Sequence, residues 1–371
     1  EKLMQMGRIT NIYGDVYYNG RGVFTMVMDG DKYEQSLDLG RLVVAYLQES
    51  FTLSNLEIRL NTLVCIARLP DDLPSYNTLI NFTGSFHRTV PDVPHIVVLS
   101  DILSSKDYRM KTDVDDIIKR GIAGNKFKMY YQPIYSVEQQ KFISAEALIR
   151  LYDYEYGFVS PAIFIPAAEA SGAIHDIGDF VFEDVCRFIH SPEFAKSGLE
   201  YIEINLSVTQ CIEPKLVEKI RGLISKYQVR TSQINLEITE SGSIYEKKLL
   251  LDNMNKLIEY GVNFSLDDFG TGNSNLNYVV DMPVELVKFD RDMIVSYFEN
   301  GKAKYVMEAA MHMIHGLKLK IVSEGIETKE MLDTMAALGI SYIQGFYFSK
   351  PIPEDDFIDF INEKNMLSVE G

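Results

Sequence analysis

The feature that most constrains the fold is a regular alternation of short β-prone runs with longer amphipathic stretches, which begins near Lys128. A strand that is followed by a crossover helix returns to a parallel strand, so this alternation predicts an α/β fold. Eight such units in about 240 residues suit a TIM-like (β/α)₈ barrel, and an open doubly wound sheet is the alternative. The predicted strands are Met129–Ile134, Ile143–Ile149, Tyr201–Leu206, Gln233–Ile238, Val262–Leu266, Leu286–Phe289, Leu319–Val322 and Tyr342–Phe346.

The chain before the barrel predicts a second, smaller α/β domain. We expect this domain over residues 1–100, a polar linker over 101–113, and the barrel over 114–371. The linker leads into a predicted helix over Val114–Ile122. The smaller domain is predicted to contain a strand, a helix and a longer strand-like run: Val23–Met28, Asp38–Gln48 and Leu56–Arg68.

Charge and composition exclude several classes of protein. The net charge of −17 opposes binding to nucleic acid polymers and to anionic membranes. No apolar run approaches the roughly 18 residues that cross a bilayer, and the three cysteines show neither disulfide nor zinc spacing. Because the sequence starts at Glu1 without a signal peptide, we expect a cytoplasmic fragment of a longer protein. That longer protein could carry a membrane anchor upstream.

Polar side chains lie within or just after nearly every predicted strand of the barrel. Catalytic groups of such barrels gather at the carboxyl ends of the strands, and strand interiors are normally apolar. Any one of these residues alone could be a hydrogen-bonded structural group. Several carboxylates that converge on one barrel mouth would repel one another without cations between them. The residues in question are Gln132, Glu146, Asn205, Glu237, Asp267, Asp268, Lys288, Glu324 and Gln344.

The donor types in this set predict the kind of metal. Carboxylates and an amide, without His or Cys, suit hard cations such as Mg²⁺ or Mn²⁺. The adjacent pair Asp267 and Asp268 suits two ions, which together form the usual clamp for displacement at phosphorus. The sequence therefore predicts a metal-dependent enzyme that acts on a phosphate ester.

The stretches around these residues resemble the EAL domain family over about residues 114–360. The resemblance implies a TIM-like barrel with one antiparallel strand, and hydrolysis of the bacterial second messenger cyclic di-GMP to linear pGpG. The matching motifs are Tyr131-Gln-Pro-Ile134, Glu146-Ala-Leu148 with Arg150, Asn205-Leu-Ser207, Leu236-Glu-Ile-Thr-Glu240, Asp267-Asp-Phe-Gly-Thr-Gly272, Val287-Lys-Phe-Asp290, Glu324-Gly-Ile-Glu327 and Gln344-Gly345.

The resemblance also implies a role for each site residue. Asp268 would serve a second metal ion, and Glu240 would anchor the loop after Asp267. Lys288 would orient or polarise the attacking water, and Glu324 would be the general base or a second-metal ligand acting through water. The metal ligands would be Glu146, Asn205, Glu237 and Asp267. The residues of the substrate pocket would be Gln132, Arg150, Asp290 and Gln344.

Cofactors and partners follow from the same resemblance. We expect two Mg²⁺ or Mn²⁺ ions per site, with Ca²⁺ binding yet inhibiting, and a homodimer through residues 267–280 and the next helix. The chain departs from the family at Leu151, where Trp is usual, and at Asn273 and Asn275 in the loop after Asp267. The alternatives to an enzyme are a cyclic di-GMP receptor that does not cleave its ligand and a regulatory scaffold.

The N-terminal part resembles the second half of a GGDEF domain, a cyclase module. The naming motif is replaced by Gly20-Arg-Gly-Val-Phe24, with Gly22 and Val23 where acidic residues are usual. Asn11 and Gly14 replace the Arg and Asp of the inhibitory signature. We therefore expect a degenerate, truncated module that makes no cyclic di-GMP.

Overall fold

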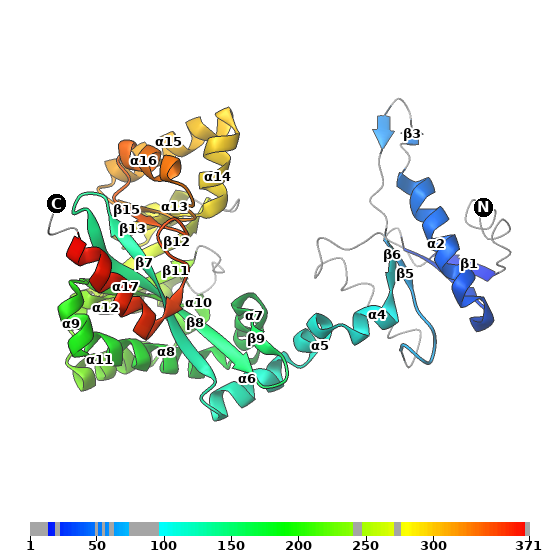
Figure 1. Cartoon of the computed structure of the whole chain (residues 1–371), viewed down its shortest axis with the longest axis horizontal. Helices are drawn as coiled ribbons and strands as arrows, with labels where there is room; N and C mark the ends of the chain where they lie inside the picture. The colour runs from blue at the N-terminus through cyan, green and yellow to red at the C-terminus, as the bar shows by residue number, and fades with distance from the viewer. Residues whose placement is uncertain are drawn as a thin grey trace. The chain divides into compact units, whose positions relative to one another are not determined.

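The computed structural model describes residues 14–18, 23–48, 51–53, 56–58, 63–73, 96–239, 247–270 and 276–367. The chain divides into two compact units, residues 1–113 and 114–371 (Figure 1). Each unit is described separately below.

The second unit is a closed barrel of eight strands. Neighbouring strands follow one another around the barrel, and a pairing between the first two strands closes it. The closed barrel is the predicted architecture, and the open doubly wound sheet is excluded. All eight predicted strands are present: β7 (Phe127–Ser136), β8 (Lys141–Asp153), β10 (Tyr201–Asn205), β11 (Ile234–Thr239), β12 (Asn263–Phe269), β13 (Leu286–Phe289), β14 (Lys320–Ser323) and β15 (Tyr342–Gln344).

One strand of the barrel runs against the others, as the resemblance implied. β7 is antiparallel to both of its neighbours, β8 and β15, whereas β8 and β10 to β15 pair in parallel. The first connection is a tight hairpin rather than a crossover helix. Two short strands extend the sheet beyond the barrel: β9 (Gly157–Val159) on β8 and β16 (Ile352–Pro353) on β7.

Helices surround the barrel (Figure 1). They pack on the outward side chains of the strands, and the ring of Tyr131 lies 4.6 Å from Phe188 and 5.4 Å from Phe357, between centroids. The helices are α6 (Val114–Ala123), α7 (Pro161–Ser171), α8 (Ile174–Ile189), α9 (Pro192–Ser197), α10 (Val208–Cys211), α11 (Leu216–Tyr227), α12 (Lys247–Tyr260), α13 (Leu276–Asp281), α14 (Arg291–Glu299), α15 (Gly301–Gly316), α16 (Lys329–Ala337) and α17 (Glu354–Leu367), with a 3₁₀ turn, η2 (Thr231–Gln233).

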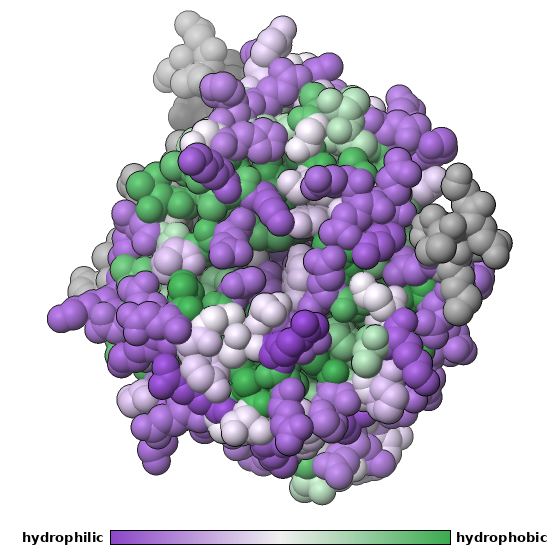
Figure 2. Space-filling model, turned by 90° about the vertical axis from the view of Figure 1, so that its left-hand side faces the viewer, coloured by the Kyte–Doolittle hydropathy of each residue, from purple (hydrophilic) through white to green (hydrophobic). Residues whose placement is uncertain are grey.

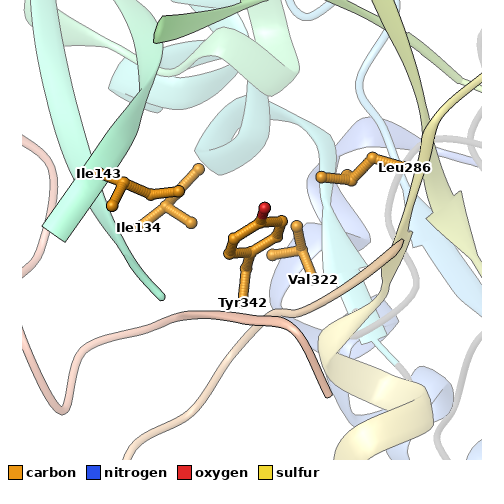
Figure 3. Close-up of a cluster of buried hydrophobic side chains, with 5 residues drawn as sticks. All are labelled: Ile134, Ile143, Leu286, Val322 and Tyr342. Atoms are coloured by element: carbon orange, nitrogen blue, oxygen red, sulfur yellow. The ribbon is translucent and has the colours of Figure 1, made fainter. Parts of the chain in front are cut away.

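The barrel interior has an apolar floor. Figure 3 shows its side chains, which come from five strands and point toward one another, with Tyr342 among them. Because side chains alternate along a strand, the residues two positions after Leu286, Val322 and Tyr342 also face the interior. These residues are Lys288, Glu324 and Gln344, which are all polar. The floor residues are Ile134, Ile143, Leu286, Val322 and Tyr342.

The first unit contains short strands and a long helix. β1 (Gly14–Tyr18) pairs antiparallel with β2 (Phe24–Met28), and Met26 and Met28 pack on Leu39 and Val43 of α2 (Tyr33–Gln48). The expected strand Val23–Met28 and helix Asp38–Gln48 are therefore present, although the helix starts earlier. The other elements are η1 (Gly30–Lys32), β3 (Phe51–Leu53), β4 (Leu56–Ile58), β5 (Val64–Ile66), β6 (Ile96–Val98), α4 (Leu99–Ser104) and α5 (Lys106–Thr112).

One expectation for this unit needs correction. The run Leu56–Arg68 is not one strand, because β4 pairs with β3 whereas β5 pairs in parallel with β6. Local alternation predicted extended backbone there but could not reveal that its two halves pair with different partners.

The segment 101–113 is largely helical. Ser105 caps α5 by accepting a hydrogen bond from the Tyr108 N–H at 3.2 Å.

The surface agrees with an acidic, polar protein. In the face shown in Figure 2, hydrophilic side chains separate the apolar ones, which form scattered patches. Within the part of the chain that the structure describes, no helix is long and apolar enough to cross a membrane. Cys65, Cys186 and Cys211 are free thiols, as their spacing predicted.

Candidate active site

Lys288 lies at the centre of the site. It is the middle of the buried strand β13, its side chain is fully buried, and its Nζ is surrounded by carboxylates. The closest carboxylate oxygens are those of Glu324 at 2.7 Å and Glu237 at 2.8 Å. Glu146, Glu203 and Asp267 follow at 3.3, 3.7 and 4.0 Å.

Glu146 is held by two further side chains. Its two carboxylate oxygens accept hydrogen bonds from Asn205 and Gln344, each at 2.7 Å. Gln344 also donates to Gln132 at 3.0 Å, and Gln132 donates to the backbone carbonyl of Ser349 at 3.1 Å. Gln132 and Glu146 are directly opposite each other on β7 and β8, which fixes their spacing. Gln344 therefore orients Glu146, and Gln132 in turn holds Gln344.

Asp267 and Asp268 lie at an irregularity of β12. The register with β13 shifts between Leu266 and Phe269, and Asp268 has a left-handed backbone with φ of 57°. In a regular strand adjacent side chains point to opposite faces, whereas a bulge re-aims one of them. Both carboxylates consequently interact electrostatically with Glu146 and Lys288. Asp267 Oδ1 also accepts a hydrogen bond from the Asp268 N–H at 2.8 Å.

The site concentrates negative charge in a buried place. Five carboxylates share the single ammonium of Lys288, so this group alone carries a formal charge of −4. Burial raises the pKa of Glu324 to about 8 and that of Asp267 to about 6, with Lys288 opposing both shifts. The pKa of Glu237 is also well above its ordinary value, chiefly because of burial. The positive charge of Lys288 alone is too small to neutralise these carboxylates.

The residues fit hard divalent cations. All the donors are carboxylate or amide oxygens, and within the described residues the buried Glu237 carboxylate has no hydrogen-bond donor besides the Lys288 ammonium, which lies 2.8 Å from Oε1. Among those residues no group of three His, Cys, Asp or Glu side chains is arranged to hold a metal ion as it stands. The reason is visible in the contacts: the Lys288 ammonium lies among the carboxylates, and Asn205 bonds to Glu146.

Arg150 lies further along the same face of β8 as Glu146. Strands β7 and β8 pair without a register break from Gln132 outward, so alternate residues of this ribbon share the face that leads from the site. The guanidinium of Arg150 lies 5.6 Å from the centre of the Tyr130 ring, and the charge of Glu146 acts on it. Arg150 therefore lies outward of the carboxylates around Lys288 on the same face.

The structure brings together most of the predicted site residues. Asp290 caps α14 by accepting a hydrogen bond from the Asp292 N–H at 2.7 Å, and its charge acts on Asp268. Glu240, Asn273 and Asn275 lie outside the described residues. The residues that converge around Lys288 are Gln132, Glu146, Asn205, Glu237, Asp267, Asp268, Glu324 and Gln344.

Glu203 is a site residue that the sequence analysis missed. It is fully buried in the interior of β10, two residues before Asn205, and its carboxylate lies 3.7 Å from Lys288 Nζ. The sequence did contain a signal: an acidic residue stands between Ile202 and Ile204 with the same parity as Asn205. Strand alternation therefore places Glu203 and Asn205 on the same face.

The comparisons with known proteins agree with this geometry. The EAL domain family matches residues 115–351, well over half of the chain. The chain belongs to the EAL domain family. Phosphodiesterases of this family act on cyclic di-GMP and depend on divalent metal ions in general.

Individual curated proteins and a solved structure are also similar to this chain. The signaling protein YkoW of Bacillus subtilis is 33% identical over 262 residues, which are 69% of this chain and 32% of YkoW. The bifunctional diguanylate cyclase/cyclic di-GMP phosphodiesterase MucR of Pseudomonas aeruginosa is 25% identical over 340 residues, 91% of this chain and 50% of MucR. A solved structure of the PaMucR phosphodiesterase in complex with c-di-GMP has 29% identity and a TM-score of 0.62, over 66% of this chain and 99% of that one. The chain thus spans a third to a half of these two curated relatives.

Proposed function

We propose that the EAL barrel hydrolyses cyclic di-GMP to linear pGpG with two divalent ions, Mg²⁺ or Mn²⁺. The observation that carries the proposal is the convergence of carboxylates and amides on Lys288 at the mouth of an EAL barrel. Such a surplus of buried negative charge needs cations, and cations in turn would allow an anionic phosphodiester to enter.

We propose distinct roles for the acidic and basic residues. Glu146, Asn205, Glu237 and Asp267 would hold one ion, and Asp268 would contribute to the second. When bound, such ions would supply Lewis-acid activation of the phosphodiester and a water of lowered pKa. Glu324 is half-buried beside Lys288, and this position suits a general base that receives the proton of the attacking water.

The remaining residues would orient these groups and bind the substrate. Lys288 would keep its proton and fix Glu324 and the attacking water in line. Arg150 would donate to a phosphate oxygen, and Asp290 would contact the substrate beside Asp268. Glu240 would anchor the loop that follows Asp267. Gln132 and Gln344 would hold Glu146 in position through the hydrogen bonds already described.

The test is direct incubation of the chain with cyclic di-GMP and Mn²⁺, followed by chromatography for pGpG. We expect turnover by the wild-type chain and none by Glu146→Ala. A receptor would bind the nucleotide, measured by calorimetry, without making the product. A scaffold would do neither, and either result would refute the proposed enzyme.

We also propose a homodimer through the region that follows Asp267. Exposed apolar side chains of α13, α14 and α15 support it, namely Val280, Phe298, Tyr305 and Val306. We expect a dimer at micromolar concentration by analytical ultracentrifugation, and a monomer for Tyr305→Glu. The similarly exposed Tyr154 lies beside Arg120 of α6, so Tyr154→Glu is the matched control and should stay dimeric.

We propose that residues 1–100 are a degenerate GGDEF-like module, separated by residues 101–113 from the EAL domain over 114–371. The hairpin of β1 and β2 supports it, as does the coverage of the match to MucR. Phosphoryl transfer requires metal-bound carboxylates, and Gly20–Phe24 supplies none, although Gly20–Gly22 lie outside the described residues. With Glu324→Gln suppressing product loss, we expect no cyclic di-GMP from GTP; its appearance would refute the assignment.

A further inference from the structure

Glu203 is a buried carboxylate that the proposed mechanism does not use. Its side chain is fully buried, and within the described part of the chain neither of its oxygens accepts a hydrogen bond, while the Glu237 carboxyl lies close enough to share a proton with it. A buried carboxylate is costly unless it is paired. The cationic group near it is the Lys288 ammonium, 3.7 Å from Oε2.

Glu203 lies deeper in the barrel than Asn205, the proposed metal ligand on its own strand. Asn205, on the same face of β10 and two residues later, is exposed at the mouth, whereas Glu203 is fully buried. Two residues earlier on this face, Tyr201 packs against the apolar floor shown in Figure 3. Glu203 therefore lies between the floor and the open end of the site. Substrate at the mouth does not reach this position.

The other acidic neighbours of Lys288 also have proposed roles in metal binding or catalysis. Glu146, Glu237 and Asp267 are proposed metal ligands, and Glu324 is the proposed base. Divalent cations would compete with the ammonium for these carboxylates. A lysine that lost them all would be left buried and unpaired, at a large cost in free energy. Glu203 supplies a negative charge that remains with Lys288 when the other carboxylates bind cations.

We propose that Glu203 is a positioning residue for Lys288, which holds the ammonium in place while divalent cations occupy the other carboxylates around it. This inference rests on the proposed function. Without Glu203, the Lys288 ammonium would interact more strongly with Glu146 and Glu237. It would therefore compete more strongly with the cations for these two carboxylates. Loss of the Glu203 charge should thus weaken cation binding and slow turnover, while substrate binding remains intact.

The first test is Glu203→Gln, which keeps the shape and removes the charge. We expect kcat to fall about 10- to 100-fold and Mn²⁺ affinity, measured by calorimetry, to weaken by a similar factor. KM for cyclic di-GMP at saturating Mn²⁺ should change less than about 2-fold, since KM reports uniform binding. Asn235, opposite Glu203 on β11, is equally buried and donates to Ser265 Oγ at 3.1 Å. Asn235→Ala is therefore the control for a general defect in this layer.

The second test is a double-mutant cycle on Mn²⁺ affinity. If Glu203 acts through Lys288, Glu203→Gln should weaken Mn²⁺ binding in the wild type but not in Lys288→Met. Equal weakening in both backgrounds would show a direct effect of the charge on the ion and would overturn the positioning role. Wild-type behaviour of Glu203→Gln, or a loss equal to that of Asn235→Ala, would also overturn it.

Two further outcomes remain interpretable. If Glu203→Gln does not fold, Glu203→Asp retains the charge one methylene further from Lys288. We then expect a smaller loss of Mn²⁺ affinity in this variant, with KM unchanged, and unaltered Mn²⁺ affinity would contradict the inference. If the wild type binds Mn²⁺ but makes no pGpG, the proposed hydrolysis fails, while the cycle on Mn²⁺ affinity still decides the role of Glu203.

Discussion

Replacing Lys288 by methionine removes the ammonium that five buried carboxylates share. Methionine fills a similar volume, so the change isolates the charge from the packing. Breaking a buried ion pair by removing one partner costs about 3–5 kcal/mol, because the other charge is left uncompensated. For a domain of this size, about 1 kcal/mol corresponds to a shift in Tm of roughly 2–4 °C. We therefore expect Tm of the metal-free protein to fall by about 6–20 °C.

The assay is thermal unfolding in EDTA and then in Mg²⁺. A ligand at about 100 times its Kd stabilises the native state by about 2.7 kcal/mol. In Lys288→Met the Mg²⁺ ion no longer competes with an ammonium for the carboxylates. Mg²⁺ should accordingly raise Tm more in this variant than in the wild type, while turnover stays lost.

The matched control is Lys320→Met on the neighbouring strand β14. Lys320 is exposed, and its Nζ donates a hydrogen bond to the Tyr342 hydroxyl at 2.9 Å. Loss of one such bond costs about 1 kcal/mol. If Lys288→Met is no more destabilising in EDTA than Lys320→Met, the buried ammonium does not balance the carboxylates and the account of the site is wrong.

Other predictions concern the metal, the substrate and pH. Asp267→Asn should abolish turnover, because a neutral amide replaces a ligand charge; retention of most activity, measured as pGpG release, would refute its assignment. Arg150→Ala should raise KM about 10- to 100-fold with little change in kcat, and an unchanged KM would remove Arg150 from the phosphate site. Ca²⁺ should bind yet inhibit, since it prefers longer bonds and more ligands than Mg²⁺; comparable rates with Ca²⁺ alone would contradict the paired-metal geometry. Because the folded-state pKa of Glu324 is about 8, above its unfolded value, the native state binds the extra proton, so stability of the metal-free protein should fall as pH rises from about 5 to 8. Denaturant unfolding in EDTA checks this, and a rise in stability over that range would refute it.

Much of the barrel could be predicted from the sequence because its signals are local. Alternation of apolar residues located all eight strands to within a few residues, and Leu286–Phe289 was predicted with its observed bounds. Polar residues at the strand ends stood out for the same reason, since each interrupts an otherwise apolar run. The eight motifs then identified the family, and with it the antiparallel first strand that periodicity alone did not reveal.

Tertiary structure decided what depends on partners distant in the sequence. Pairing separated Leu56–Arg68 into strands of two different sheets, and closure of the barrel brought Glu203 to 3.7 Å from Lys288. The shift in β12 turned Asp268 toward the charges that Asp267 also meets. Each of these features depends on the register between strands far apart in the chain. A strand's own sequence specifies which side chains share a face, but barrel closure determines which charges meet there.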